Sequence, residues 1–159
     1  MPDAKTQAVL QEIVNELSNK YDFPNFEPHA TLLGDIEIDL ELLKEKTTEL
    51  AKQFRPFEVT LGKVEISTTY WRYVFVRVDT SGELVDLNMK ARELIDPMPD
   101  DIFMPHISLA YGEDDAYKRQ QIADEIKLPN LSFMIDKIVI TPADPNPTKW
   151  KHLSEIKLG

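Results

Sequence analysis

Cysteine is absent from the sequence, which excludes disulfide bonds and thiolate metal ligands. This is compatible with a reducing compartment. Apolar runs are all too short to span a bilayer. The first residues also lack the basic region and apolar stretch of a signal peptide. We therefore expect a soluble, cytoplasmic protein with no membrane partner.

Basic residues are scarce relative to acidic ones. The chain has 18 Lys and Arg against 28 Asp and Glu, a formal net charge of −10. A protein that holds long nucleic acid neutralises phosphates with Lys and Arg, and an acidic chain repels that backbone. A small, locally basic pocket is still compatible with this charge. We expect a small-molecule partner, no long nucleic acid and a monomer.

The 159 residues suit one ordinary domain or two small lobes that share a core. Apolar periodicity predicts helices over residues 5–20, 40–54, 82–95 and 113–127, with Asp39 and Ser81 as caps of the second and third. Strands are predicted over residues 29–33, 56–67 (with a bulge at Gly62), 70–80, 106–111, 131–142 and 150–158. A proline-rich loop is predicted over residues 96–105, where Met98 is interpreted as a packing residue.

The predicted elements run in the same order twice: helix, short strand, helix, strand, strand. Each half is too small to bury a good core alone, so the two should pack together. This pattern indicates an internal duplication. We expect one domain of two lobes, about residues 1–68 and 69–159, with possible strand exchange between them.

Two of the three histidines stand in the same short motif, once in each half. The copies are PHATLLG, residues 28–34, and PHISLAYG, residues 105–112. Alternate residues of a strand share a face, so His29 projects with Thr31 and His106 with Ser108. If the lobes face each other, their cleft receives two imidazoles and two hydroxyls. One imidazole can take a proton from water while the other protonates the leaving oxygen, and the hydroxyls can bind phosphate oxygens. The paired motif therefore indicates phosphoester hydrolysis without a metal.

Two other interpretations stay open. Duplication can preserve the motif for folding alone, with proline opening each strand and glycine ending it, which leaves a non-catalytic site. His29, His106 and His152 can also form a three-histidine metal site, in which the repeated hydroxyls have no function. His152 lies outside the repeat, and its surroundings favour a solvated or locally hydrogen-bonded histidine.

The paired motif resembles the signature of the two-histidine (2H) phosphoesterases, a repeated His-x-Thr/Ser. Within that superfamily, FEPHATLLG and MPHISLAYG look most like the eukaryotic cyclic phosphodiesterase branch. The similarity runs from about residue 7 to the C-terminus. It implies a bilobal, pseudo-duplicated α+β fold. Two antiparallel sheets would face a central cleft, each motif on a central strand, with the helices outside.

The resemblance also implies a reaction. It is the metal-free opening of a cyclic phosphate, with no cofactor, in a nucleoside 2′,3′-cyclic phosphate or ADP-ribose 1″,2″-cyclic phosphate. In that branch the product keeps the 2′-phosphate, or the 1″-phosphate of the ADP-ribose substrate. His29 and His106 would be the acid/base pair, with His106 favoured as the base, and Thr31 and Ser108 would bind phosphate.

Three aromatic residues are further candidates for substrate binding. Tyr111 falls where the branch has a tyrosine after the second motif, although strand alternation from His106 points it to the opposite face. A core tyrosine is the alternative. Tyr70 and Trp71 can stack on a base, but along a strand only one of them can face the cleft.

The chain departs from its apparent relatives at the N-terminus. They usually open with a strand before the first helix, whereas this chain enters its helix almost at once. We expect either an unpaired sheet edge in one lobe or another segment in that place.

Two alternative functions remain from the sequence. One is an RNA-end 2′,3′-cyclic phosphodiesterase or ligase of the same superfamily, against which the net charge argues. The other is a nucleotide-binding module without turnover. Pure binding would be better served by Arg or Lys than by two acid/base histidines.

Overall fold

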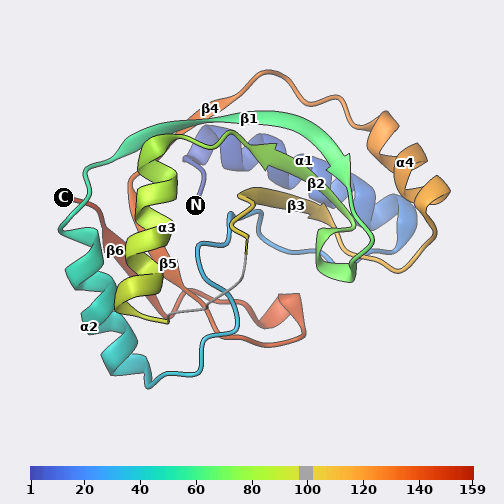
Figure 1. Cartoon of the computed structure of the whole chain (residues 1–159). Coiled ribbons are helices and arrows are strands. Elements are labelled where there is room, and N and C mark those ends of the chain that lie inside the picture. Colours follow the sequence, from blue (N-terminus) through green and yellow to red (C-terminus); the bar gives the residue numbers. More distant parts are fainter. Residues whose placement is uncertain (97–101) are drawn as a thin grey trace.

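The helices predicted from apolar periodicity all form, and a side chain caps each at its N-terminus. The computed structural model describes residues 1–96 and 102–159 (Figure 1). The helices in this part of the chain are α1 (Ala4–Tyr21), α2 (Leu40–Ala51), α3 (Gly82–Leu94) and α4 (Ala116–Glu125). Asp3, Asp39, Ser81 and Asp115 each accept a hydrogen bond from an N–H of the first turn. These bonds satisfy amides that would otherwise lack a partner, and they confirm the predicted caps Asp39 and Ser81.

The strands of the described residues pair into two antiparallel sheets. They are β1 (Phe57–Ile66), β2 (Val74–Val78), β3 (His106–Ala110), β4 (Ser132–Ile135), β5 (Lys137–Ile140) and β6 (Ser154–Lys157). One sheet has the order β3-β2-β1-β4 and the other pairs β5 with β6. The β1–β2 register shifts between Leu61 and Val64, which confirms the bulge predicted at Gly62. Together with the helices, these sheets confirm the predicted α+β class.

Two predicted strands that carry candidate site residues are wrong in extent. Residues 29–33 form no strand: Ala30 makes a single bridge to Ile107. Residues 70–80 divide into a 3₁₀ helix, η1 (Tyr70–Arg72), and the strand β2. Backbone bonds in this region include Gly112 N–H to the Tyr70 carbonyl at 3.4 Å, so a tertiary contact helps to hold the turn.

The C-terminal strands are also shorter than predicted. Residues 131–142 split at Asp136, because Ile135 of β4 pairs with Phe57 in the larger sheet while Lys137 of β5 pairs with Lys157. Residues 150–158 contain only β6, and a second 3₁₀ turn, η2 (Pro147–Lys149), precedes them. Part of the predicted loop over residues 96–105 lies outside the described residues, and Met98 belongs to that part.

Helices from both halves of the chain cover the sheets (Figure 1). α1 contacts β3, and α4 contacts β1 and β2. α2 packs against β5 and β6, and α3 packs against α2. The core between these layers includes the fully buried Tyr73, Val74, Val76 and Val78. The lobe boundary near residue 68 stays a prediction.

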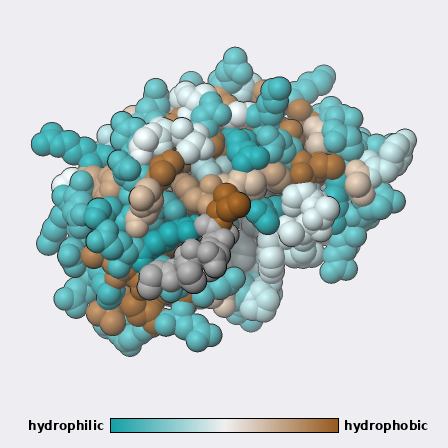
Figure 2. Space-filling model, viewed as in Figure 1, coloured by the Kyte–Doolittle hydropathy of each residue, from teal (hydrophilic) through white to brown (hydrophobic). Residues whose placement is uncertain are grey.

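The chain reaches α1 after three residues, and no strand precedes it in the described part. Met1 instead lies beside the smaller sheet, where it lines a cavity with Thr141 and His152. Hydrophilic side chains dominate the face seen in Figure 2, and hydrophobic ones form small separate patches. Among the described helices, none combines the length and apolar character needed to cross a membrane.

Candidate active site

An isolated antiparallel bridge joins the two histidine motifs by pairing Ala30 with Ile107. One position to either side of this bridge, His29 faces Ser108 and Thr31 faces His106. Ile107 is fully buried, so alternation turns the neighbouring side chains to the opposite face. The bridge thus sets the two motifs side by side, and His29 lies close enough to His106 for its charge to lower the pKa of that ring. Diagonal neighbours in a regular antiparallel pair lie about 7 to 8 Å apart, within reach of long and aromatic side chains.

Each histidine ring is held in the same way by a carbonyl two residues earlier. His29 Nδ1 lies 2.7 Å from the Glu27 oxygen, and His106 Nδ1 lies 2.8 Å from the Met104 oxygen. A carbonyl oxygen can only accept, so each Nδ1 carries the hydrogen. This fixes the tautomer, and Nε2 becomes the atom of each neutral ring that can take up or release a proton.

Both imidazoles favour the neutral form. Burial is the main cause that lowers the pKa of His29 and of His106 below the ordinary value for histidine. The charged neighbours of His106 lower its pKa further, because Arg72, His29 and Arg77 are all cations when protonated. The neighbours of His29 have mixed effects: Glu27 raises its pKa, whereas the N-terminal amine and His152 lower it.

The two motif hydroxyls differ in their surroundings. Thr31 is exposed, whereas Ser108 is buried and donates its proton to the Trp71 carbonyl at 2.8 Å. Burial raises the pKa of Tyr111, and the nearby Ser108 hydroxyl acts against this rise. The motif hydroxyls are therefore alike in sequence but not in readiness to bind an anion.

Tyr111 is a core residue, as the alternative prediction had it, and its role in substrate binding stays a prediction. Its ring is buried and stacks on Phe26 with centroids 4.1 Å apart, as a core tyrosine would. Its hydroxyl nevertheless reaches Ser108, because β3 ends at Ala110 and alternation no longer applies.

Tyr70 and Trp71 both join the aromatic group around Tyr111. Trp71 lies 5.1 Å and Tyr70 lies 6.0 Å from the Tyr111 ring, centroid to centroid. The expectation that only one of them can face the site assumed a strand, and η1 forms there instead. Arg119 fixes this turn: its buried guanidinium donates to the carbonyls of Ser67 and Thr69.

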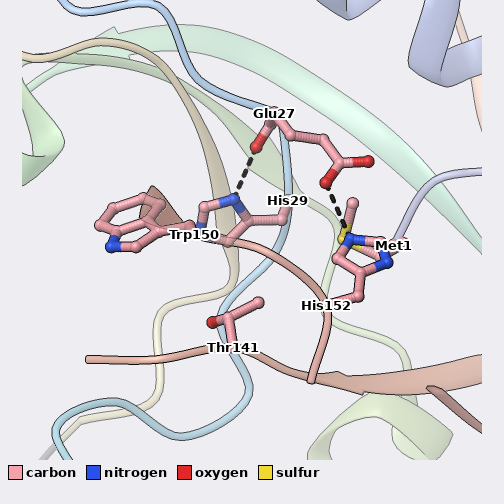
Figure 3. Close-up of a pocket in the computed structure, with 6 residues that line it drawn as sticks. All are labelled: Met1, Glu27, His29, Thr141, Trp150 and His152. Atoms are coloured by element: carbon pink, nitrogen blue, oxygen red, sulfur yellow. Dashed lines mark hydrogen bonds and ion pairs between the residues drawn. The ribbon is translucent and has the colours of Figure 1, made fainter. Parts of the chain in front are cut away.

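Trp150 and His152 approach His29 from the C-terminal segment (Figure 3). The Trp150 ring lies edge-on to His29 at 5.4 Å, and its Nε1 donates to the Asp144 carbonyl at 2.6 Å. The small cavity here, about 20 Å³, is lined by Met1, Glu27, His29, Thr141, Trp150 and His152. Trp150 was missed from sequence, since only the folded chain brings it to the first motif.

The three-histidine metal interpretation is not supported by the side-chain geometry. His152 bonds to Glu155 and Glu27 through its two ring nitrogens, which agrees with the predicted locally bonded histidine. Within residues 1–96 and 102–159, no group of three or more His, Cys, Asp or Glu side chains is arranged to hold a metal ion.

Strand β2 adds two residues that sequence analysis did not single out. Arg77 pairs with His106 and Phe75 with Ser108, so both side chains lie on the face of the motif. The Phe75 ring is 5.3 Å from His106, and Arg77 forms a 2.8 Å ion pair with Glu65. Alternation within VFVRV was the available signal, since it puts Phe75 and Arg77 on one face.

The fold and the paired motif agree with comparisons to known proteins. The family model described as the 2′-5′ RNA ligase superfamily matches residues 2–144. The chain belongs to this superfamily. This confirms the predicted resemblance to the 2H phosphoesterases.

Named relatives of this superfamily member include phosphoesterases from a plant and a bacterium. A cyclic phosphodiesterase of Arabidopsis thaliana is 19% identical over 91% of this chain and 82% of its own length. A putative phosphoesterase of Oceanobacillus iheyensis is 32% identical over 64% of this chain and 63% of its own length.

Solved structures share the superfamily fold over nearly the whole chain. A Thermus thermophilus protein has a TM-score of 0.66 at 20% identity and covers 99% of this chain and 93% of its own. Escherichia coli LigT complexed with 3′-AMP has a TM-score of 0.64 at 19% identity, over 95% of this chain and 92% of its own.

Proposed function

We propose that the protein hydrolyses the cyclic phosphodiester of a small nucleotide to a phosphomonoester. The substrates are a nucleoside 2′,3′-cyclic phosphate or ADP-ribose 1″,2″-cyclic phosphate, and His29 and His106 are the acid and base. The Ala30–Ile107 bridge carries this proposal, because it sets two motifs side by side whose imidazoles have the same fixed tautomer.

The reaction is a single in-line displacement at phosphorus. The neutral Nε2 of one histidine takes a proton from water as the water oxygen forms its bond to phosphorus. The P–O3′ bond breaks, and the protonated Nε2 of the other histidine gives its proton to O3′. The product is the 2′-phosphate, and the two histidines end with their protonation states exchanged.

The charged neighbours support His106 as the base. Arg72, Arg77 and His29 all disfavour a positive charge on its ring. His29 is then the acid, and an anionic phosphate beside it supplies the opposite charge that favours its imidazolium.

Hydroxyl and aromatic groups complete the proposed site. Thr31 is available to donate to a phosphate oxygen, and Ser108 can do so once it leaves the Trp71 carbonyl. Trp71, 43% exposed, offers a ring face for a nucleobase. The name of the Arabidopsis relative is consistent with a cyclic substrate.

Turnover assays with product identification test the proposal. The substrates are 2′,3′-cyclic AMP, ADP-ribose 1″,2″-cyclic phosphate and an RNA oligonucleotide ending in a 2′,3′-cyclic phosphate, each with and without EDTA. We expect a 2′-phosphate product from cyclic AMP, no effect of EDTA, and a higher kcat/KM for the mononucleotide, since the net charge of −10 repels a longer anion.

Variants of the two histidines, compared with a control variant, test whether these residues carry the activity. His29→Ala and His106→Ala should each lower kcat by about 10²- to 10⁴-fold. Lys44→Met, which removes the Lys44–Glu41 ion pair on α2, is the control and should leave kcat unchanged. Loss of activity in EDTA, or opening of the oligonucleotide alone, would overturn the proposal in favour of a metal site or an RNA-end enzyme.

A further inference from the structure

His152 lies between two carboxylates on different parts of the chain (Figure 3). Its Nδ1 is 2.6 Å from Glu155 Oε1 in β6, and its Nε2 is 2.8 Å from Glu27 Oε2, before the first motif. Carboxylates accept hydrogen bonds, so the ring satisfies both only as a doubly protonated imidazolium. The arrangement is thus a charged clamp rather than a solvated histidine.

The surrounding carboxylates favour the protonated form of this ring. The hydrogen bond to Glu155 is the largest cause that raises the pKa of His152, and Glu27 raises it as well. Lys137 and His152 together lower the pKa of Glu155 to about 2. Three groups nearby can carry a positive charge. Lys137 shares Glu155 with His152, and burial lowers the pKa of both His29 and the N-terminal amine.

Glu27 connects this clamp to the proposed reaction. Its side chain binds His152, while its backbone oxygen accepts the Nδ1 hydrogen of His29 at 2.7 Å. Residues 22–29 form neither helix nor strand, and side chains hold them instead. Gln11 Nε2 donates to the Phe26 carbonyl at 3.1 Å, which anchors the chain directly before Glu27. The ion pair to His152 ties Glu27 itself to the β5–β6 sheet.

We propose that His152 is a positioning residue, which holds Glu27 so that its carbonyl keeps His29 in the tautomer and orientation needed at phosphorus. The inference rests on the proposed function for its catalytic consequence but not for the positioning itself. Met104 occupies the equivalent place before His106, and its apolar side chain cannot form such an ion pair. The ion pair to the residue two positions before the histidine is therefore a feature of the first motif and not of the second.

The test measures the ring nitrogens of His29 directly. In ¹H–¹⁵N spectra of the full chain, wild-type His29 should show a protonated Nδ1 and an unprotonated Nε2. In His152→Ala and in Glu27→Gln we expect the two ¹⁵N shifts of His29 to move toward each other, as the tautomers mix, while those of His106 stay in place. Lys20→Met is the matched control, because it removes the Lys20–Glu125 ion pair, which involves neither His152 nor its two carboxylate partners.

Kinetics of the same variants give the second readout. Since small misplacements of a reacting group are costly, kcat for the cyclic substrate should fall about tenfold or more with KM little changed. The Glu27→Gln/His152→Ala double variant should lose no more than the worse single one. Unchanged His29 shifts in a folded His152→Ala or Glu27→Gln protein would overturn the inference. Wild-type protein that turns over no cyclic phosphate would contradict the proposed function alone, because the shifts still report positioning.

Discussion

The Nδ1 atoms of His29 and His106 each donate a hydrogen bond to a backbone carbonyl, and this determines which protons the two rings can exchange. Each ring exchanges a proton only at Nε2, and burial keeps both neutral in the absence of a ligand. In the proposed reaction, a phosphate anion that enters the site raises the pKa of one ring and so supplies the general acid. Sequence reasoning predicted the two histidines and their hydroxyls, but the carbonyls that select the tautomers come from backbone geometry and leave no residue signature.

The lowered pKa values of the two free histidines predict that kcat/KM and kcat depend differently on pH. The bell of kcat/KM reports the free enzyme, whose histidine pKa values are lowered, so its optimum should lie below the ordinary histidine value of about 6.5. The bell of kcat reports the bound complex, where the phosphate raises one pKa, so its optimum should be more alkaline. Steady-state kinetics across pH 4.5 to 9 will measure both; coincident optima, or a more acidic kcat optimum, would contradict the lowered pKa values.

At the level of elements, the glycines that close the two motifs have different roles. A Cβ on Gly112 would lie 3.1 Å from the Tyr73 ring and 3.3 Å from Phe23, both packed against the larger sheet. A Cβ on Gly34 would meet only the Thr31 methyl, at 3.6 Å. Of the two glycines, therefore, Gly112 is required by close packing and Gly34 is not.

Substitution of the two glycines should separate these roles. Gly112→Ala should lower the free energy of unfolding by about 1 to 3 kcal/mol, because the new methyl group overpacks a buried aromatic contact. Gly34→Ala is the matched control and should change it by less than about 0.5 kcal/mol. Urea unfolding curves measure both, and equal effects at the two positions would show that the packing difference is not real.

The elements themselves were predictable where the signal is local. α1 to α4 follow from apolar spacing and capping residues, and the bulge follows from Gly62. The segment at Tyr70 and Trp71 was not, because its aromatic composition favours a strand while tertiary contacts hold it in a turn. Ser108 binds the Trp71 carbonyl, and Arg119 binds the carbonyls of Ser67 and Thr69. No local pattern contains these partners.

For the whole molecule, the charge is acidic overall but locally mixed at the site. The net charge of −10 opposes long anions, whereas Arg72 and Arg77 lie close enough to His106 to affect its pKa. The site also draws on distant parts of the chain: His152 and Glu27 are 125 positions apart. Such convergence explains why Trp150 and the His152 clamp could not be found from sequence, although the paired motif could.

The central claim is that His29 and His106 act together on one phosphorus. A titration with a nucleoside–vanadate complex, which mimics five-coordinate phosphorus, tests it when followed by the ¹⁵N signals of the histidine rings. We predict that the Nε2 signals of His29 and His106 shift together along one binding curve, that one of the two becomes protonated, and that His152 does not respond. A response from only one of the pair, or two curves with different midpoints, would contradict the claim.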